Sequence, residues 1–212
     1  TGAITPIVET SLTDPYSLTA DRDGGRIVFA APVSTVDETG AQIGSDLFLH
    51  DRRQGTTTRL TERGALRHPA LSPDGSSLFA VRQEKEFASL VEIEMETGIQ
   101  RLVLRIAGSN LFTPFVRDDS ASIVFAVNIR GKQDIAQIDI DVPRFPIVRD
   151  LGEAWNADRV VFLTDTAAAE YYPRQSGNYL VYGSDANNLL ELYQLDLRSG
   201  VSSLLVTDPI GA

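Results

Sequence analysis

The side chains best suited to chemistry in this sequence are few, and the two histidines come first. His50 stands beside Asp51, and His68 precedes Pro69. An imidazole titrates near neutral pH, so it can serve as a base or as a metal ligand. A metal site needs several such ligands close together, and neither histidine has another beside it in the sequence. We interpret His68 as a hydrogen-bonding or packing residue that could also contact a ligand, and His50 as a surface contact.

The acidic sequence Asp-Arg-Asp-Gly at residues 21–24 resembles the start of a calcium-binding loop. Such loops need a third acidic position at a fixed spacing and a distal glutamate, and this sequence has neither. A polar turn recurs at the same place in each repeat described below, including Asp118 and Asp119. We therefore interpret these aspartates as turn residues, and the sequence predicts no metal site.

Nucleophiles are equally scarce. The chain contains no cysteine, and Gly183-Ser184 is followed by Asp185 rather than by the pattern of a serine-hydrolase elbow. Thr1 would act as an N-terminal nucleophile only within a dedicated sandwich fold, which the repeats do not offer. No phosphate-binding loop or dinucleotide fingerprint is present. We predict no catalytic residue and no cofactor, and the sequence favours a non-catalytic chain over an enzyme.

The negative charge of the chain disfavours some classes of binding partner. The 212 residues carry a formal net charge of −10, and the pI is about 4.6. A surface of this sign repels nucleic acid and anionic lipid headgroups. No apolar stretch approaches the roughly 20 residues of a membrane span. We expect another protein as partner, with a small-molecule or sugar ligand as the alternative. The chain opens on Thr1, without an initiator methionine or a signal peptide, so we expect a processed chain or a fragment.

A repeated element must position these side chains. A polar turn followed by a short apolar run occurs at residues 20–30, 71–81, 117–127 and 174–183. This spacing, roughly 50 residues, is typical of stacked supersecondary repeats. The second unit divides into four strands, a to d, at residues 67–72, 78–82, 90–96 and 99–104. Strand b is apolar at consecutive positions, which favours burial of both its faces, whereas strand c alternates and is half-buried.

Four-stranded repeats at this spacing predict an all-β fold, a β-propeller of antiparallel blades around a central channel. We expect complete blades at about residues 12–61, 66–104, 110–150 and 170–207, with residues 147–149 as strand d of the third. Residues 152–169 are interpreted as an insertion or a degenerate half-blade, and residues 1–8 as a lone outer strand. That strand is surplus, because the last unit has its own strand d. The chain is then part of a propeller with six or more blades, or a four-bladed ring with an extra edge strand.

Three stretches of this repeat carry a family resemblance. Pro-Ala-Leu-Ser-Pro-Asp-Gly at residues 69–75, Asp-Leu-Arg-Ser-Gly at residues 196–200 and Arg-Leu-Thr at residues 59–61 resemble the TolB-like (WD-like) β-propeller repeat. The second unit matches best, and the third lacks both the glycine after its aspartate and the usual c–d turn. The resemblance implies a periplasmic or extracellular bacterial protein and, commonly, a six-bladed ring that docks other proteins. Related propellers also belong to prolyl-oligopeptidase-type peptidases and to lyases of sugar-acid oligomers, so the fold does not decide the function.

The up-and-down strand order places the b–c and d–a connections on one side of the blades, which we call the loop face. The b–c loops, at residues 32–45, 83–86, 128–133 and 184–188, are longer than the turns opposite, and function concentrates on long loops of a rigid scaffold. Candidate binding residues on this face are Arg82, Lys85, Arg130, Lys132, Asp185, Asn187 and Asn188, and candidates in the channel are His68, Tyr171 and Tyr172. The predicted function is a non-catalytic protein-binding platform. The alternative is the substrate-gating or substrate-binding propeller of a hydrolase or polysaccharide lyase whose catalytic residues lie outside this chain.

Overall fold

The computed structural model describes residues 7–8, 10–37, 40–144 and 153–206. They form four sheets, each of four antiparallel strands that pair in chain order. The first sheet holds β1 (Leu18–Ala20), β2 (Arg26–Asp37), β3 (Gly40–Asp51) and β4 (Thr56–Arg59), and the second β5 (Leu66–Leu71), β6 (Ser77–Gln83), β7 (Phe87–Glu94) and β8 (Gln100–Ala107). The third holds β9 (Ser109–Val116), β10 (Ser122–Ile129), β11 (Lys132–Asp139) and β12 (Val161–Phe162), with a 3-10 turn, η1 (Ala157–Arg159), before β12. The fourth holds β13 (Glu170–Ser176), β14 (Tyr179–Ser184), β15 (Glu191–Asp196) and β16 (Val201–Val206).

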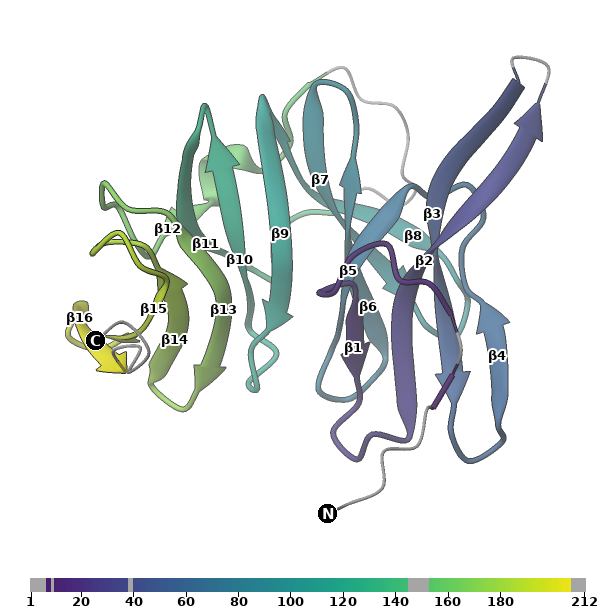
Figure 1. The fold of residues 1–212 in the computed structure, drawn as a ribbon, viewed down its shortest axis with the longest axis horizontal. Helices are drawn as coiled ribbons and strands as arrows, with labels where there is room; N and C mark the ends of the chain where they lie inside the picture. Colours follow the sequence, from purple (N-terminus) through teal and green to yellow (C-terminus); the bar gives the residue numbers. More distant parts are fainter. Residues whose placement is uncertain (1–6, 9, 38–39, 145–152, 207–212) are drawn as a thin grey trace.

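The sheets stand next to one another as a fan (Figure 1). β5 packs against β2 and β3, β9 against β6 and β7, and β13 against β10 and β11. The first strands also contact one another in turn, β1 with β5, β5 with β9, and β9 with β13. Each sheet is therefore a blade whose first strand lies innermost. The predicted all-β propeller fold of four-stranded antiparallel blades is confirmed.

The second strand of a blade forms the core because neighbouring blades cover both of its faces. In β6, Leu78, Phe79 and Val81 are each no more than 1% exposed. Successive residues of a strand point to opposite faces. Leu78 accordingly packs into the cluster between the first and second blades, and Phe79 into the cluster between the second and third. This double burial is the reason for the consecutive apolar residues in the sequence.

The third blade differs from its prediction. Its outer strand is β12, in which Val161 and Phe162 pair with β11. Residues 152–169 are therefore not an insertion outside the repeat, because they supply the outer strand of this blade. Residues 147–149, predicted for that role, lie outside the described residues. A long connection replaces the tight turn that joins the third and fourth strands of the other blades, so no turn signal marked the position of β12.

Trp155 and Asn156 fasten this long connection to the second blade. Trp155 exchanges two backbone hydrogen bonds of 2.9 Å with Arg105 of β8. The side-chain amide of Asn156 donates to the carbonyl oxygens of Val103 and Pro143, at 2.7 and 2.8 Å. The single tryptophan of the chain thus lies at the outer edge of the blades, where the segment crosses from one blade to the next.

Two predicted loops are hairpins in the structure. Residues 32–45 continue β2 and β3 as a paired ribbon up to Asp37 and Gly40, and Figure 1 shows this ribbon projecting beyond the other blades. The ribbon satisfies its own backbone hydrogen bonds, and its β-branched residues favour extended structure. Residues 128–133 form a tight turn with Arg130 and Gly131 at its centre, at φ of +55° and +91°, as two-residue hairpin turns require. The expectation of long loops between the second and third strands is wrong for the first and third blades.

The lone outer strand predicted for residues 1–8 falls mostly outside the described residues. Ile7 and Val8, which are described, are not part of a strand.

Among the described residues, none covers the far face of the fourth blade. Within the described ranges, no strand packs on β14 and β15 as β13 packs on β10 and β11. All six residues of β16 are exposed, among them Leu204, Leu205 and Val206 at 41%, 45% and 53%. The equivalent faces of the first three blades are each buried by the next blade, so this apolar face has room for a neighbour.

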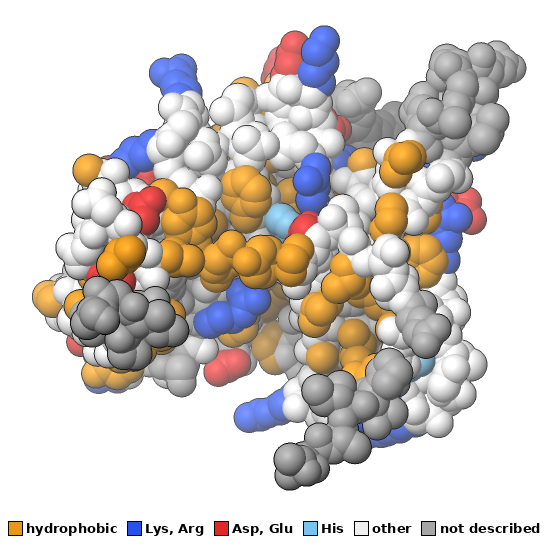
Figure 2. Space-filling view, viewed as in Figure 1, with side chains coloured by type: hydrophobic (Ala, Val, Ile, Leu, Met, Phe, Trp, Pro, Cys, Tyr) orange, Lys and Arg blue, Asp and Glu red, His pale blue; other side chains and the backbone are white. Residues whose placement is uncertain are grey.

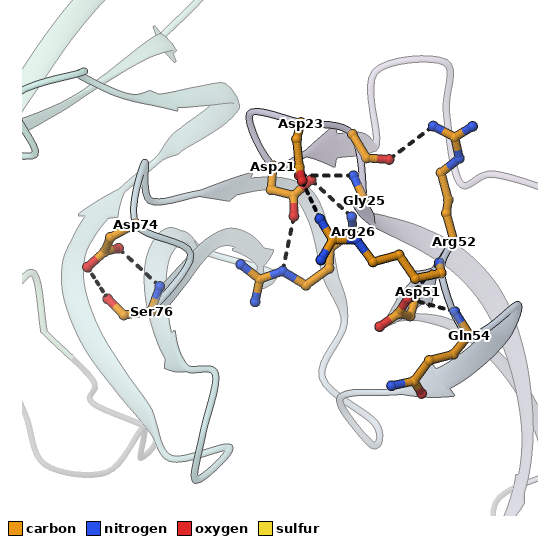
Figure 3. Close-up of polar contacts among 11 residues, drawn as sticks. Asp21, Asp23, Gly25, Arg26, Asp51, Arg52, Gln54, Asp74 and Ser76 are labelled. Atoms are coloured by element: carbon orange, nitrogen blue, oxygen red, sulfur yellow. Dashed lines mark hydrogen bonds and ion pairs between the residues drawn. The ribbon is translucent and has the colours of Figure 1, made fainter.

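Aspartate carboxylates close the turns on the side opposite the loop face (Figure 3). The backbone N–H of Arg26 donates to Asp21 at 2.9 Å, that of Gln54 to Asp51 at 3.0 Å, and that of Ser76 to Asp74 at 3.0 Å. Hydrogen bonds from Ser72 and Ser76 lower the pKa of Asp74 to about 2. Asp23 accepts from Gly25 in the same way, so the aspartates once compared with a calcium loop act as turn residues.

Gly75 should tolerate alanine less well than Gly98, although φ is +71° at both. A Cβ at Gly75 would lie 1.9 Å from Nη2 of Arg26, which pairs with Asp21, whereas a Cβ at Gly98 would meet no atom within 4 Å. Positive φ alone costs an alanine about 1–2 kcal/mol. The Gly98→Ala variant measures this backbone cost, because its Cβ meets no neighbouring atom. We expect Gly75→Ala to lower the free energy of unfolding by about 1 kcal/mol more, because the ion pair must also move. Urea denaturation measures both; equal losses would contradict the predicted effect of the close approach.

Candidate functional site

The segment before β1 and residues of the other three blades, mainly from their innermost strands, line an open cavity of about 340 Å³. Its walls include Asp14, Tyr16, His68, Thr113, Tyr171 and Tyr172. The three residues predicted for the channel, His68, Tyr171 and Tyr172, are therefore brought together. Figure 2 shows apolar side chains gathered across the middle of this face, with a histidine, an acidic and a basic side chain among them.

Three wall residues share one backbone feature. His68, Thr113 and Tyr172 each precede a proline and have φ of +50°, +44° and +54°. Each lies where the pairing of its strand with the second strand of the blade shifts register, which marks a β-bulge. Positive φ is strained for residues with a Cβ, most of all for β-branched threonine. The X-Pro dipeptide in the first strand of three blades is the sequence signal for this site, and none of the predicted site residues rests on it.

His68 connects three blades. Its Nε2 lies 3.0 Å from Oδ2 of Asp14 in the first blade, and its Nδ1 accepts the backbone N–H of Thr113 in the third at 3.3 Å. Because Nδ1 is an acceptor, Nε2 carries the proton that is donated to Asp14. Burial lowers the pKa of His68 and outweighs the opposing effect of Asp14, which keeps the ring neutral at pH 7. Both ring nitrogens are engaged, so the histidine serves as a hydrogen-bonding link.

Tyr16 and Tyr172 close the cavity between the first and fourth blades. Their rings stack with centroids 4.4 Å apart, and Tyr171 lies 5.8 Å from Tyr172. A hydrogen bond between the hydroxyls of Tyr16 and Tyr172, together with burial, raises the pKa of Tyr172 to about 12. Tyr16 is 49% exposed and Tyr172 is 36% exposed. The pair thus presents an aromatic surface to solvent at the cavity.

His50 does not belong to this cavity and is not the surface contact that the sequence predicted. It is 7% exposed, and its Nδ1 lies 2.9 Å from the hydroxyl of Thr57 in the neighbouring strand. The hydrogen bond to β4 accounts for its burial.

The predicted loop-face residues fall into three groups. Lys85 and Arg130 are exposed at two turns, and their side chains form no hydrogen bond or ion pair within the described ranges. Lys132 pairs with Asp165 and, at 3.3 Å, with Asp134, while Arg82 donates to the carbonyl of Gly64 and to Gln100, both at 3.0 Å. Asp185, Asn187 and Asn188 share the β14–β15 loop, where Asp185 accepts from the N–H of Ala169 at 2.7 Å and Asn187 donates to Glu191 at 2.7 Å. The structure therefore leaves Lys85 and Arg130 free for contact and gives Arg82 a role within the fold.

A second hollow, of about 630 Å³, lies on the uncovered face of the fourth blade, with Glu170, Tyr182 and Asp185 in its wall. Burial raises the pKa of Glu170, although the hydroxyls of Thr166 and Thr164 donate to its carboxylate.

Among the described residues, no three His, Asp or Glu side chains gather closely enough to hold a metal ion. The same part of the chain contains no helix with the length and apolarity to span a membrane.

The fold and the central cavity define the class: a set of β-propeller blades with a pocket at the axis. No protein-family signature and no curated protein matches the sequence. Solved structures do resemble it. The putative TolB from Agrobacterium tumefaciens superposes with a TM-score of 0.68 and 18% identity, over 90% of this chain and 64% of that one.

Two further solved structures show the same fold. TolB from Acinetobacter baumannii gives a TM-score of 0.65 with 19% identity, over 87% of this chain and 42% of that one. An oligogalacturonate lyase from Vibrio parahaemolyticus gives 0.61 with 11% identity, over 96% of this chain and 56% of that one. The chain thus spans less than two thirds of the length of each of these three structures. At such identities the likeness establishes the TolB-like propeller fold and leaves the function open.

Proposed function

We propose that this protein is a non-catalytic platform that docks another protein through the loop face and the mouth of the central cavity. The observation that carries the proposal is the exposed stack of Tyr16 on Tyr172, which lies at the cavity and joins the first blade to the fourth. Tyrosines in fixed positions supply contact area at low entropic cost, and they are enriched among the residues that dominate binding energy.

Rigidity of the surroundings supports this proposal. His68 ties the second blade to the first and the third, and the bulges fix the direction of three wall residues. A surface that is already ordered loses less conformational entropy on association than mobile loops do. Because both nitrogens of His68 are engaged in these links, binding suits the cavity better than general-base catalysis does.

The TolB neighbours agree with a docking role at the level of the fold alone. On the same resemblance we propose a periplasmic or extracellular setting. The uncovered face of the fourth blade supports a further proposal, that additional blades complete the ring.

The alternative function is the substrate-binding propeller of a lyase or hydrolase, and the likeness to the oligogalacturonate lyase favours that reading. The complete natural gene product distinguishes the two. A catalytic domain in the same polypeptide would favour the enzyme, and further blades without one would favour the platform.

Charge reversal on the loop face tests the docking proposal. Proteins captured from an extract of the source organism are identified, and the affinity of the purified partner is then measured by calorimetry. We expect the double variant Lys85→Glu, Arg130→Glu to bind at least about tenfold more weakly, because both side chains are exposed and uncommitted. The matched control is Arg22→Glu, Arg198→Glu, which changes the same charge on the opposite side and should bind within about twofold of the unmodified protein. Equal weakening by both variants would contradict docking on this face.

A further inference from the structure

The central cavity contains hydrogen-bond donors that no described residue accepts from. Arg67, beside His68 in β5, lines the cavity and is half-buried. No carboxylate or other acceptor in the described part of the chain pairs with its guanidinium, which has five N–H donors. The hydroxyl of Thr113 is buried in the same wall and has no partner there either. A buried donor without a partner is unfavourable, so the hydroxyl of Thr113 favours a ligand that brings an acceptor, and the half-buried guanidinium of Arg67 can reach the same ligand.

The carboxylate of Asp14, which also lines this cavity, is already occupied by donors. Asp14 Oδ1 accepts the backbone N–H of Tyr16 at 2.9 Å, and its Oδ2 accepts from Ser17 at 2.7 Å and from His68 at 3.0 Å. The Asp14 carboxylate therefore accepts three hydrogen bonds, whereas no described residue pairs with the guanidinium of Arg67. The remaining walls are the side-chain amide of Gln133 and aromatic or apolar side chains, among them Phe112 and the two stacked tyrosines. A ligand that matches both the Arg67 guanidinium and the aromatic walls is a planar anion that carries an apolar group.

We propose that the cavity takes a carboxylate of the docking partner, held by Arg67, while the apolar part of the same residue lies against Tyr16 and Tyr172. A guanidinium matches a carboxylate in two parallel hydrogen bonds, and such charge-assisted pairs are stronger than neutral ones. The volume, about 340 Å³, is at the lower end for ligand pockets and suits one side chain or a chain terminus. The carboxylate comes from an acidic side chain or from a C-terminus. This inference rests on the proposed docking function, because it assigns the cavity to a protein partner.

Small probes test the cavity without the natural partner. Phenylacetate should bind at least about tenfold more tightly than phenylacetamide, which has the same ring and no charge, as titrated by NMR or calorimetry. Two acetylated peptides then locate the source: one has a free C-terminal carboxylate, and the other is amidated and carries an internal glutamate. Binding of either peptide supports the inference and identifies the source. Binding of galacturonate in preference to both would overturn it in favour of a sugar-acid site, and equal affinities for phenylacetate and phenylacetamide would overturn it outright.

Arg67 variants tie the effect to this residue. In Arg67→Gln the preference for phenylacetate over phenylacetamide should disappear. In Arg67→Lys the preference should persist in weakened form, because lysine keeps the positive charge but lacks the two parallel N–H donors of the guanidinium. The matched control is Arg22→Gln, an exposed arginine on the opposite side, which should retain the full preference. Since none of the described residues pairs with the Arg67 guanidinium, the Arg67→Gln variant should unfold at an unchanged urea midpoint. An undiminished preference in Arg67→Gln would overturn the inference.

Different results would contradict the proposed docking on the loop face and the proposed carboxylate site in the cavity. Phenylacetate binding should survive in the Lys85→Glu, Arg130→Glu variant, whose changes lie outside the cavity. If a protein partner binds Arg67→Gln with unchanged affinity, the carboxylate assignment is wrong and docking on the loop face stands.

Discussion

An Asp46→Ala variant should unfold with a free energy about 3–5 kcal/mol lower than that of the unmodified protein. The Asp46 side chain is 0% exposed, and its carboxylate pairs with Arg59. It also accepts from the hydroxyl of Thr61 at 2.9 Å and from the backbone N–H groups of Arg63 and Gly64 at 3.1 and 2.8 Å. Alanine would leave the hydroxyl of Thr61 and the N–H of Gly64, both donors of buried hydrogen bonds, without this acceptor. The connection from the first blade to the second would lose the group that orders it.

Asp51→Ala is the matched control, because Asp51 also accepts two backbone N–H groups, from Arg53 and Gln54. These donors are exposed in a turn, so water can replace the carboxylate, and we expect a loss of about 1 kcal/mol. Urea denaturation followed by the fluorescence of Trp155, the single tryptophan, measures both variants. Losses of similar size would show that burial does not determine how much the Asp46 carboxylate contributes to the free energy of unfolding.

The architecture could be predicted because its signals are local. Burial of β6 and β10 on both faces requires consecutive apolar residues, and the turns between strands require aspartate and glycine, so both features are visible in the sequence. The errors arose where the local signal is ambiguous. β12 has two residues and follows a long connection, and the β2–β3 ribbon contains a proline and glycines that usually mark a loop.

The site could be predicted in part. His68, Tyr171 and Tyr172 were expected in the channel because strand order alone places the first strand of each blade at the axis. Arg67 and Thr113 were missed because their importance depends on what they lack, a partner, and that requires three-dimensional contacts. Asp46 was missed for a related reason, since a single aspartate in a strand gives no sign that four surrounding donors converge on it.

His68→Ala should lower the free energy of unfolding by about 2–4 kcal/mol at pH 7.5, because the N–H of Thr113 loses its acceptor and Asp14 loses a donor. His50→Ala removes the same atoms from the only other histidine of the chain. His50 is also buried, but its side-chain hydrogen bond to Thr57 lies within one blade, so we expect a loss of about 1–2 kcal/mol. The comparison separates the loss of a link between blades from the loss of a buried imidazole.

The dependence on pH gives this prediction a second and independent test. Burial lowers the pKa of His68 below its unfolded value of 6.5, with Arg67 acting in the same direction and Asp14 against it. Below pH 6.5 the unfolded chain binds the proton more readily than the folded chain, so the contribution of His68 is complete above pH 6.5 and declines as the pH falls. The loss caused by His68→Ala should therefore be largest at pH 7.5 and smaller at pH 5.5. A loss that grows on acidification would mean that the protonated ring is the one that Asp14 stabilises, and the neutral link between blades would be wrong.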